Sequence, residues 1–432
     1  MKIALSIGRY LATSLLTVVI FWSFLTFLLV SNFTGKLLNA EFYTDILDAN
    51  DAYNRVYDEV LVDPGIRKFA GDFTENFQII NHQEVVALAR EIAPPDYLRE
   101  QVESNIASTV EYLDGRSSSL ELYIDLDPPL ELAKPTIFSY TDHRIDSIEI
   151  LGASSGLSLL EQITRVEELT RGIMWDLATG KTPNAIPPIG IIPSPLRDDV
   201  FDNILVSILD DPSIVQKVRQ GLEDNLPVIR QEFIAGDTRQ FLKEAAHAGL
   251  TPLLDLAIAE VSQNLDGQNR INVIATMARN NPEVTEQSLR TDLANLQQLL
   301  GRIKTWGKTV ALWVGIGASI ALFLIYLPSL TNALRWPGLL LFFIGLILLI
   351  LSRILATILP GRITPLIREA LAQSPDIPLS AVALISDLAQ SFNQQIFSGM
   401  GAPALIILLV GALMFGGSFL VVFLKPVIPG IR

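Results

Sequence analysis

The sequence predicts a mainly α-helical membrane protein, with four transmembrane helices and a large, mostly helical extracytoplasmic domain that contains a minor β element. Two observations predict this class. Four long apolar runs each approach the roughly 20 residues that a helix needs to cross a bilayer, and the long stretch between the first two shows helical periodicity. The runs are Leu11–Val30, Val310–Leu327, Leu339–Leu359 and Ala402–Leu424. Only the third contains a charge, Arg353.

The charge of the chain is divided unevenly between the long central segment and the rest. Residues 31–300 contain 43 acids and 21 bases, a net charge of −22, whereas the remainder carries +8. Nucleic acid binding needs a basic surface, so we expect no nucleic-acid partner. The chain contains no cysteine, which excludes disulfides and thiol chemistry.

The charges that flank the first run predict its orientation. Lys2 and Arg9 precede it, whereas Lys36, Glu41 and Asp45 follow it. The side of the first span that is richer in Lys and Arg usually stays in the cytoplasm. We therefore expect a multi-pass protein of the cell membrane with both termini cytoplasmic and the large domain outside. Basic residues on the expected outer side oppose this orientation: Arg302, Lys304, Lys308, Arg353, Arg362 and Arg368.

The first run is predicted to remain as a signal anchor, because it is longer than the apolar region of a cleaved signal peptide. The connection at 183–196 contains five prolines and is predicted to be extended. It is either a seam between two lobes or a surface loop inside one domain.

These signals together divide the chain into segments. The expected segments are a cytoplasmic N-terminus (1–10), the first span (11–30), an α+β lobe (31–182), the proline-rich connection (183–196), a helical lobe with a stalk (197–305), the second span (308–327), a cytoplasmic loop (328–336), the third span (337–359), an extracytoplasmic helical loop (360–401), the fourth span (402–424) and a cytoplasmic tail (425–432).

Local signals predict several elements of the central segment. A helix opens at Pro95 and closes at Gly115, and a second apolar period runs over 160–177 and closes at Gly180. Residues 40–61 are predicted as one helix, or as two short helices that meet near 48–51. Apolar and polar residues alternate over 120–126, which predicts a strand, and a second strand is expected at 144–151.

A long helix is predicted to lead into the second span. Asn281, Pro282 and Glu283 form a helix start, and no proline interrupts the chain before Pro328. We therefore expect one helix over about 283–327 whose outer half is a rigid stalk. Its packed face is predicted to contain Leu289, Leu293, Leu296, Leu300 and Ile303 and to run on through Val310, Val314 and Gly317.

The segment between the third and fourth spans is predicted to form two helices. Thr364 and Pro365 start the first, and Pro378 precedes the second. The second helix places Ile385, Leu388, Phe392 and Ile396 on one face. It lies either in the membrane interface or packed under the large domain.

Known catalytic motifs are absent from the sequence. It contains no Gly-rich phosphate loop, His-Glu-x-x-His or Gly-x-Ser-x-Gly. We therefore predict no enzyme, with no catalytic, cofactor-binding or metal-binding residues and no cofactor. The three histidines, His82, His143 and His247, are scattered, so a histidine-rich zinc site is not expected unless the fold joins distant residues. The paired acids are interpreted as turns, helix caps or solvated faces: Asp125/Asp127, Asp198/Asp199 and Asp210/Asp211.

The apolar runs contain no acid, the residue type that marks proton and ion relays. Gly315, Gly317 and Ser319, and then Gly411, Gly416 and Gly417, are interpreted as close-packing surfaces between helices. The preferred function is a non-catalytic membrane protein whose acidic outer domain binds a protein partner, an envelope component or a ligand. The alternative is an oligomeric transporter or channel subunit, and an envelope hydrolase comes third. The expected partners are the lipid bilayer and a membrane or envelope protein, with a homo-oligomer left open.

Part of the central segment carries a family resemblance. The stretches 94–98, 111–115 and 120–126 read Pro-Pro-Asp-Tyr-Leu, Glu-Tyr-Leu-Asp-Gly and Leu-Glu-Leu-Tyr-Ile-Asp-Leu. With the order of the spans, this pattern resembles uncharacterised bacterial membrane proteins that have one N-terminal span, a large helical outer domain and three C-terminal spans. The resemblance implies an architecture and brings no activity and no functional residues.

Overall fold

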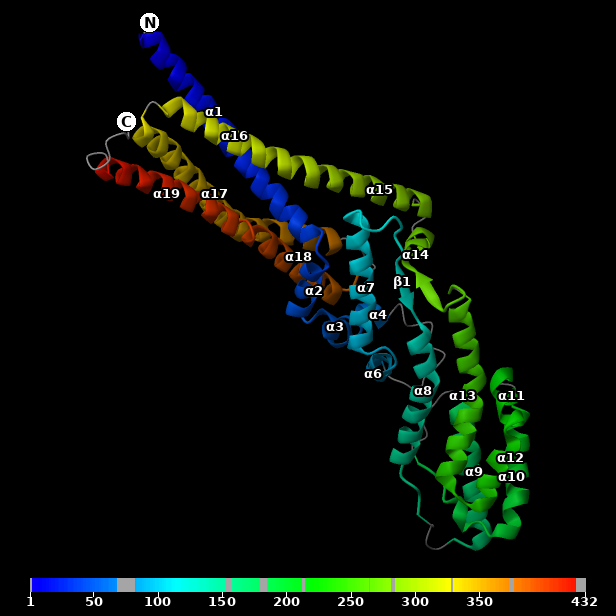
Figure 1. Cartoon of the computed structure of the whole chain (residues 1–432). Helices are drawn as coiled ribbons and strands as arrows, with labels where there is room; N and C mark the ends of the chain where they lie inside the picture. Colours follow the sequence, from blue (N-terminus) through cyan, green and yellow to red (C-terminus); the bar gives the residue numbers. More distant parts are fainter. Residues whose placement is uncertain are drawn as a thin grey trace. The chain divides into compact units, whose positions relative to one another are not determined.

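The computed structural model describes residues 2–67, 82–152, 157–178, 185–211, 214–263, 265–280, 284–327, 329–372 and 377–424 (Figure 1). The chain forms two compact units. Unit 1 comprises Met1–Arg55, Val102–Leu122 and Ile274–Arg432, and unit 2 comprises Val56–Gln101 and Tyr123–Val273. Both units are built mainly from helices, and α7 (Pro95–Leu113) contributes residues to each.

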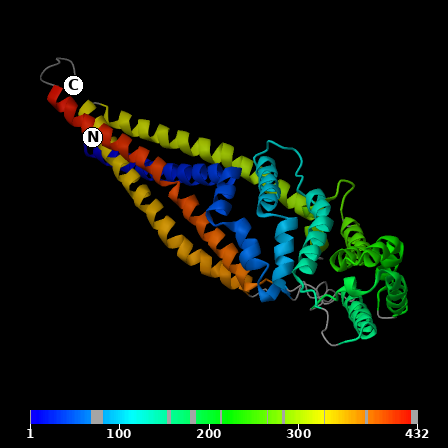
Figure 2. The ribbon, with the colours of Figure 1, turned by 90° about the horizontal axis from the view of Figure 1, so that it is seen from below.

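Unit 1 contains the four apolar helices that the sequence predicts. They are α1 (Lys2–Leu37), α16 (Lys308–Tyr326), α17 (Leu330–Ala372) and α19 (Gly401–Leu424). Helical stretches long and apolar enough to cross a membrane lie at Tyr10–Leu37, Glu286–Tyr326, Leu330–Leu371 and Leu379–Val421. These four stretches support a multi-pass membrane protein. Helix α1 packs along α16, and α17 packs along α19. In both views the start of α1, the α16–α17 turn and the end of α19 lie at one end of this bundle (Figures 1 and 2).

The helix that leads into the second span is continuous, as predicted. It consists of α15 (Glu286–Arg302), a π-helical turn η3 (Ile303–Gly307) and α16. Its start differs from the predicted one. Thr285 is the N-cap and forms a capping box with Ser288, each side chain accepting from the other's backbone N–H. The predicted start at 281–283 lies outside the described residues.

The predicted packed face of this helix is correct only in part. Leu289 and Leu293 pack against Tyr112, Leu120 and Ile274 in a small core of unit 1. Further along, the prediction is wrong: Leu296, Ile303, Val310 and Val314 are exposed by 40%, 36%, 46% and 44%, and Gly317 faces open space. Within α16 the buried positions are Ala311, Gly315, Ala318 and Leu322. A repeat of 3.5 residues drifts around a helix of 3.6 residues per turn, and the π-helical turn adds to this drift.

The third apolar helix is longer than predicted. Helix α17 runs unbroken to Ala372, so the predicted outer loop at 360–401 begins as helix, and no separate helix starts at Thr364–Pro365. A proline inside a helix removes one backbone hydrogen bond, yet α17 continues through Pro365, and it packs against α18 (Leu379–Ser398). At 43 residues, α17 is roughly twice the length that the bilayer core requires.

Helix α18 packs against other helices of unit 1. Pro378 precedes it, as predicted. On the other side it meets α2 (Ala40–Ala49) and α3 (Ala52–Arg55), the two short helices that the sequence predicts for 40–61. Asn50 Nδ2 donates to Ser391 Oγ over 3.0 Å, and Arg55 forms an ion pair with Asp387 at 3.1 Å. The structure thus shows α18 packed against helices of unit 1.

Unit 2 is a set of helices with a two-stranded sheet. Its helices are η1 (Val56–Val60), α4 (Pro64–Arg67), α6 (His82–Ile92), α8 (Asp127–Ser147), α9 (Leu159–Ala178), η2 (Ile189–Ile191), α10 (Ser194–Leu209), α11 (Gln216–Asp224), α12 (Leu226–Ala235) and α13 (Thr238–Ser262). Helix α14 (Val273–Asn280) follows the second strand. The predicted closure of α7 at Gly115 is confirmed by its left-handed φ of +76°. Gly180, the predicted end of α9, lies outside the described residues.

The strand predicted at 120–126 exists in a shorter form, whereas the second strand, predicted at 144–151, does not form. Strand β1 (Tyr123–Asp125) pairs antiparallel with β2 (Arg270–Asn272), with Ile124 opposite Ile271. The segment 144–147, expected to be strand, is the end of α8, and Ile150 makes only an isolated parallel bridge with Ile186. The alternating pattern identified the strand, but a partner 147 residues away leaves no local signal.

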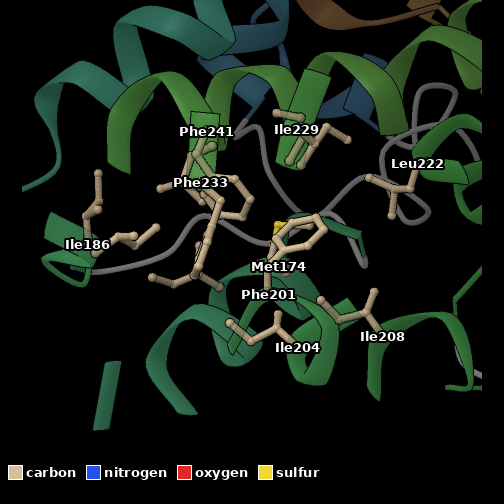
Figure 3. Close-up of a cluster of buried hydrophobic side chains, with 14 of the residues drawn as sticks. Met174, Ile186, Phe201, Ile204, Ile208, Leu222, Ile229, Phe233 and Phe241 are labelled. Carbon is tan, nitrogen blue, oxygen red and sulfur yellow. The ribbon is translucent and has the colours of Figure 1, made fainter. Parts of the chain in front are cut away.

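The large apolar core of unit 2 includes residues on both sides of the proline-rich connection (Figure 3). Ile186, Ile189 and Ile192 of the connection have no exposed surface. They share this core with Met174 before the connection and with residues after it, among them Phe201, Ile204, Phe233 and Phe241. These isoleucines anchor the connection in the core, and it contains a 3₁₀ turn at Ile189–Ile191 in place of a uniformly extended chain.

Candidate functional site

An open polar hollow lies on unit 2 where α12 turns into α13. It has a volume of about 700 Å³. Its charged side chains are Asp146, Asp237, Arg239 and Lys243, two of each sign. Its other lining residues are Ile150, Pro188, Gly190, Ala235, Gly236, Thr238 and Gln240. The hollow is therefore polar and balanced in charge, which suits recognition of a polar surface more than burial of an apolar ligand.

Arg197 joins backbone segments that lie beside the polar hollow. Its guanidinium donates to the carbonyl oxygens of Ile192 at 2.8 Å, Ile234 at 2.6 Å and Gly190 at 3.3 Å. This guanidinium also occupies the space beside Gly236, whose φ of +81° and missing side chain both favour glycine there. One side chain thus ties the proline-rich connection to the end of α12.

The start of α13 forms the edge of the polar hollow. Asp237 is its N-cap and accepts from the backbone N–H of Gln240 at 3.1 Å, which satisfies a free donor of the first turn. Thr238 is buried, and its hydroxyl accepts from the backbone N–H of Ile189 at 3.1 Å. Arg239 and Lys243, which follow in the first two turns of α13, also line the hollow. Arg239 donates to the carbonyl of Ile148 at 3.2 Å.

Polar contacts between titratable side chains join α8 and α13 in an antiparallel arrangement that reaches the polar hollow. Lys243 Nζ lies 2.8 Å from Asp146, His247 Nε2 lies 2.9 Å from Asp142, and Lys134 pairs with Asp255. The partners on α8 come progressively earlier in the sequence (146, 142, 134), and those on α13 come later by the same numbers of residues (243, 247, 255). The hydrogen bond from Lys243 lowers the pKa of the Asp146 carboxyl below its ordinary value. These pairs fix the register of the two helices.

The histidine of this series is placed as a contact between helices. The ring of His247 stacks on Phe138, with 4.3 Å between ring centroids, and its Nε2 faces Asp142. A hydrolytic triad would instead hold the imidazole against a hydroxyl or thiol nucleophile. The other histidines lie elsewhere: His82 contacts the carbonyl of Leu61 at 2.7 Å, and His143 contacts that of Ser139 at 2.7 Å.

A half-buried tyrosine of α8 lies near Glu84 of α6. Burial, together with the neighbouring Glu84 carboxylate, raises the pKa of Tyr140 to about 12, so the phenol stays neutral near pH 7. Arg144, one turn later, lies 3.7 Å from the same Glu84 carboxylate. These groups join α6 to α8. A phenol with so high a pKa is a poor general base, which favours a structural role.

The acid pairs noted in the sequence take part in turns, caps and ion pairs. Asp198 and Asp202 both bind Arg230, at 2.8 and 3.0 Å. Asp125 accepts from the backbone N–H of Asp127 at 3.0 Å, and Asp210 is the C-cap residue of α10. Across the described parts of the chain, no group of three or more His, Cys, Asp or Glu side chains is placed to hold a metal ion.

The chain was compared with known proteins in three ways. No family model matches it, and neither curated proteins nor solved structures gave a similar protein. The site must therefore be interpreted from its own geometry.

The hydroxyl groups of the apolar helices bond mainly within their own helix. Ser319, Ser352 and Ser418 donate to carbonyl oxygens three or four residues back, over 2.6–2.8 Å. Tyr326 and Thr13 form a contact between α16 and α1, with 3.3 Å between their hydroxyl oxygens. Where α16 ends and α17 begins, Tyr326 stacks on Trp336, and Arg335 lies over the ring of Phe419. This set is typical of a helix bundle at the membrane interface.

The polar hollow was not predicted from the sequence. One local signal points toward it: Gly236 followed by Asp237 is a helix end followed by a helix start. The pairing of Asp146 with Lys243 joins residues 97 positions apart, and no spacing in the sequence indicates it.

Proposed function

We propose that this chain is a multi-pass cell-membrane protein whose acidic domain lies outside the cytoplasm and binds a protein partner or envelope component there without catalysis. The observation that carries the proposal is the polar hollow of unit 2. Arg197 binds backbone carbonyls beside it, and its edge presents side chains of both charges. A charge-balanced polar surface of this kind supports recognition of a polar partner.

The cationic end of the bundle supports the orientation. Lys2 and Arg9 lie in α1 before its apolar run, and Arg335 lies just after the turn between α16 and α17, at the same end (Figure 1). The sequence segments at this end, 1–10 and 328–336, contain no acid. Lys and Arg are retained on the cytoplasmic side of a membrane, so this end is assigned to the cytoplasm.

Cysteine labelling tests the orientation directly, because the natural chain has no cysteine that could react in the background. Thr164 on α9 and Asn332 near the α16–α17 turn are both exposed. In intact cells a membrane-impermeant maleimide should label Thr164→Cys and spare Asn332→Cys until the cells are lysed. The reverse pattern would place the large domain in the cytoplasm and overturn the proposed orientation.

Site-specific photo-crosslinking tests the proposed binding surface. Gln240 lies on the edge of the polar hollow, and Gln231 on α12 is an exposed glutamine that does not line it. A photoreactive residue at 240 should capture a discrete partner in native membranes, whereas the same residue at 231 should not. Equal capture at both positions, or none at 240, would contradict the assignment of the hollow as the binding surface.

A further inference from the structure

An exposed apolar stripe follows one side of the continuous helix α15–η3–α16 in unit 1. Leu299 is exposed by 53%, Trp306 by 70% and Val310 by 46%. Gly317 lies on the same stripe, and the space where its side chain would be is open. The members of the stripe are Leu296, Leu299, Ile303, Trp306, Val310, Val314 and Gly317.

The stripe keeps a constant position relative to the packed face of the helix. Each member comes one residue before a residue that points toward a neighbouring helix. Gln297 donates to the carbonyl of Tyr112, Lys304 pairs with Asp114, and Gly307 faces Val30. The positions one residue after the stripe are Gln297, Leu300, Lys304, Gly307, Ala311, Gly315 and Ala318; Lys304 among them is itself exposed and only its ammonium group reaches Asp114. The stripe is thus offset by one residue, about 100° around the helix, and this offset continues through the π-helical turn.

The opposite side of the helix has a different character before it enters the apolar run. The residues that come one position after the packed ones include Gln298, Thr305 and Lys308, all exposed and polar. Ordinary solvent exposure therefore does not account for the apolar character of the stripe at Leu296, Leu299 and Ile303. Leu296 lies 14 residues before Val310, which is about 21 Å along a helix at 1.5 Å per residue.

We propose that the stripe is the contact between two copies of this chain, which pair in parallel along α15–η3–α16. Lipid tails can cover the stripe from Val310 onward but do not reach Leu296, whereas a soluble partner can cover Leu296 but does not enter the bilayer. A second copy supplies a helix that does both. Copies inserted in the same orientation are parallel and in register, so each stripe meets its equivalent.

The residue types along the stripe fit this pairing. The members carry no charge, so identical residues can face each other without repulsion. Ile303 and Val310 are β-branched and seven residues apart, the type and spacing that favour two-stranded parallel packing. Gly317 allows the two backbones to approach inside the bilayer, where close packing drives helix association.

Disulfide crosslinking of single-cysteine variants in native membranes tests the proposal. Leu299→Cys and Val310→Cys on the stripe should form disulfide-linked dimers under mild oxidation. The matched variants Gln298→Cys and Leu312→Cys, on the other side of the packed face, should stay monomeric. Equal dimer formation at 298 and 299 would indicate random collision. A monomer at every position, or a disulfide adduct with a different protein, would equally overturn the pairing of two copies.

A pair of glycine variants gives a second measurement that does not depend on oxidation. Gly317 on α16 and Gly416 on α19 both have open space where a side chain would point. Leucine at either position should leave the fold of one copy unchanged. Gly317→Leu should weaken self-association several-fold in a dilution series followed by energy transfer between labelled copies, and Gly416→Leu should not. The same affinity for both variants would contradict the proposed contact.

Discussion

The helix pair α17–α19 in unit 1 and the core of unit 2 are held together in different ways. In α17–α19, Gly338 and Gly345 of one helix and Gly411 of the other leave the backbones so close that a Cβ there would lie within 3 Å of the neighbouring backbone. In unit 2 the core is filled by large rings. Phe233 lies 5.1 Å from Phe241 and 5.4 Å from Phe201, between ring centroids.

The difference follows from the solvent that surrounds each region. In water, burying a large apolar side chain removes it from an unfavourable environment, so phenylalanine and isoleucine stabilise the core. In a bilayer the lipid tails are as apolar as leucine, and association depends on close packing of backbones. The two regions of the chain are therefore stabilised differently, one by burial of large apolar side chains and the other by close approach of helix backbones. A substitution that is tolerated in one region is expected to be severe in the other.

Enlarging a glycine between α17 and α19 should have the largest effect. A side chain at position 411 would overlap the backbone of Leu341 and Phe342. Gly411→Leu should destabilise the bundle by about 3 kcal/mol or more, because a backbone cannot move aside as a side chain can. The measurement is the fraction of monodisperse protein that survives heating in detergent.

Gly417→Leu is the control for that substitution, since position 417 has no atom within 4 Å of an added Cβ. It should retain the stability of the natural chain. If both variants lost stability to a similar extent, glycine would be needed for helix insertion in general. The close contact between α17 and α19 would then not explain the effect of Gly411→Leu.

The sequence predicted which residue types hold the bundle together but not all of their positions. Gly315 and Gly411 lie at helix contacts as expected, whereas Gly317, Gly416 and Gly417 face open space. Gly338 and Gly345 were missed. Composition reveals that small residues are present, but the direction that each one faces depends on how two helices cross, and residues 338 and 411 are far apart in the chain.

The same limit applies to the fold and to the polar hollow. Helix starts such as Pro95 and the apolar spans were predicted because their signals are local. The β1–β2 pairing and the contact between Asp146 and Lys243 join distant segments, so they became visible only in the structure. The proline-rich connection was predicted as extended, but three isoleucines, at 186, 189 and 192, carry it into the core.

Truncating a ring in the core of unit 2 should have the next largest effect. Phe233 is fully buried between two other rings. Phe233→Ala should cost about 3–5 kcal/mol, through lost transfer free energy and the cavity left behind. Hydrogen exchange should become faster in peptides from 200–248, while the apolar helices of unit 1 stay protected.

Val206→Ala is the matched control on α10, because Val206 is 59% exposed. Its exchange should differ little from that of the natural chain, within about 0.5 kcal/mol. If Phe233→Ala accelerated exchange in α17 and α19 to the same extent, the two regions would unfold together. The contrast between them would then describe packing alone and not separate stability.

The smallest expected effect concerns the exposed ion pair at the edge of the polar hollow. The hydrogen bond from Lys243 lowers the pKa of Asp146 in the folded chain. A carboxyl whose pKa is lowered by folding stabilises the fold above its unfolded value, here 3.8, and loses that contribution as the pH falls through the folded value. Because the pair lies at the surface, salt should screen it.

Lys243→Met should therefore lower the thermal midpoint slightly at pH 7 in low salt, and the difference should shrink both in acid and at about 1 M salt, where the Debye length is near 3 Å. Asp146→Asn should give a similar loss at pH 7, and the double variant should lose little more than either single one. Thermal unfolding across a pH series measures all three. If the thermal midpoint of Lys243→Met fell by the same amount at every pH, the effect would come from packing of the lysine stem, since that side chain is only 19% exposed. The charge of the pair would then contribute nothing measurable.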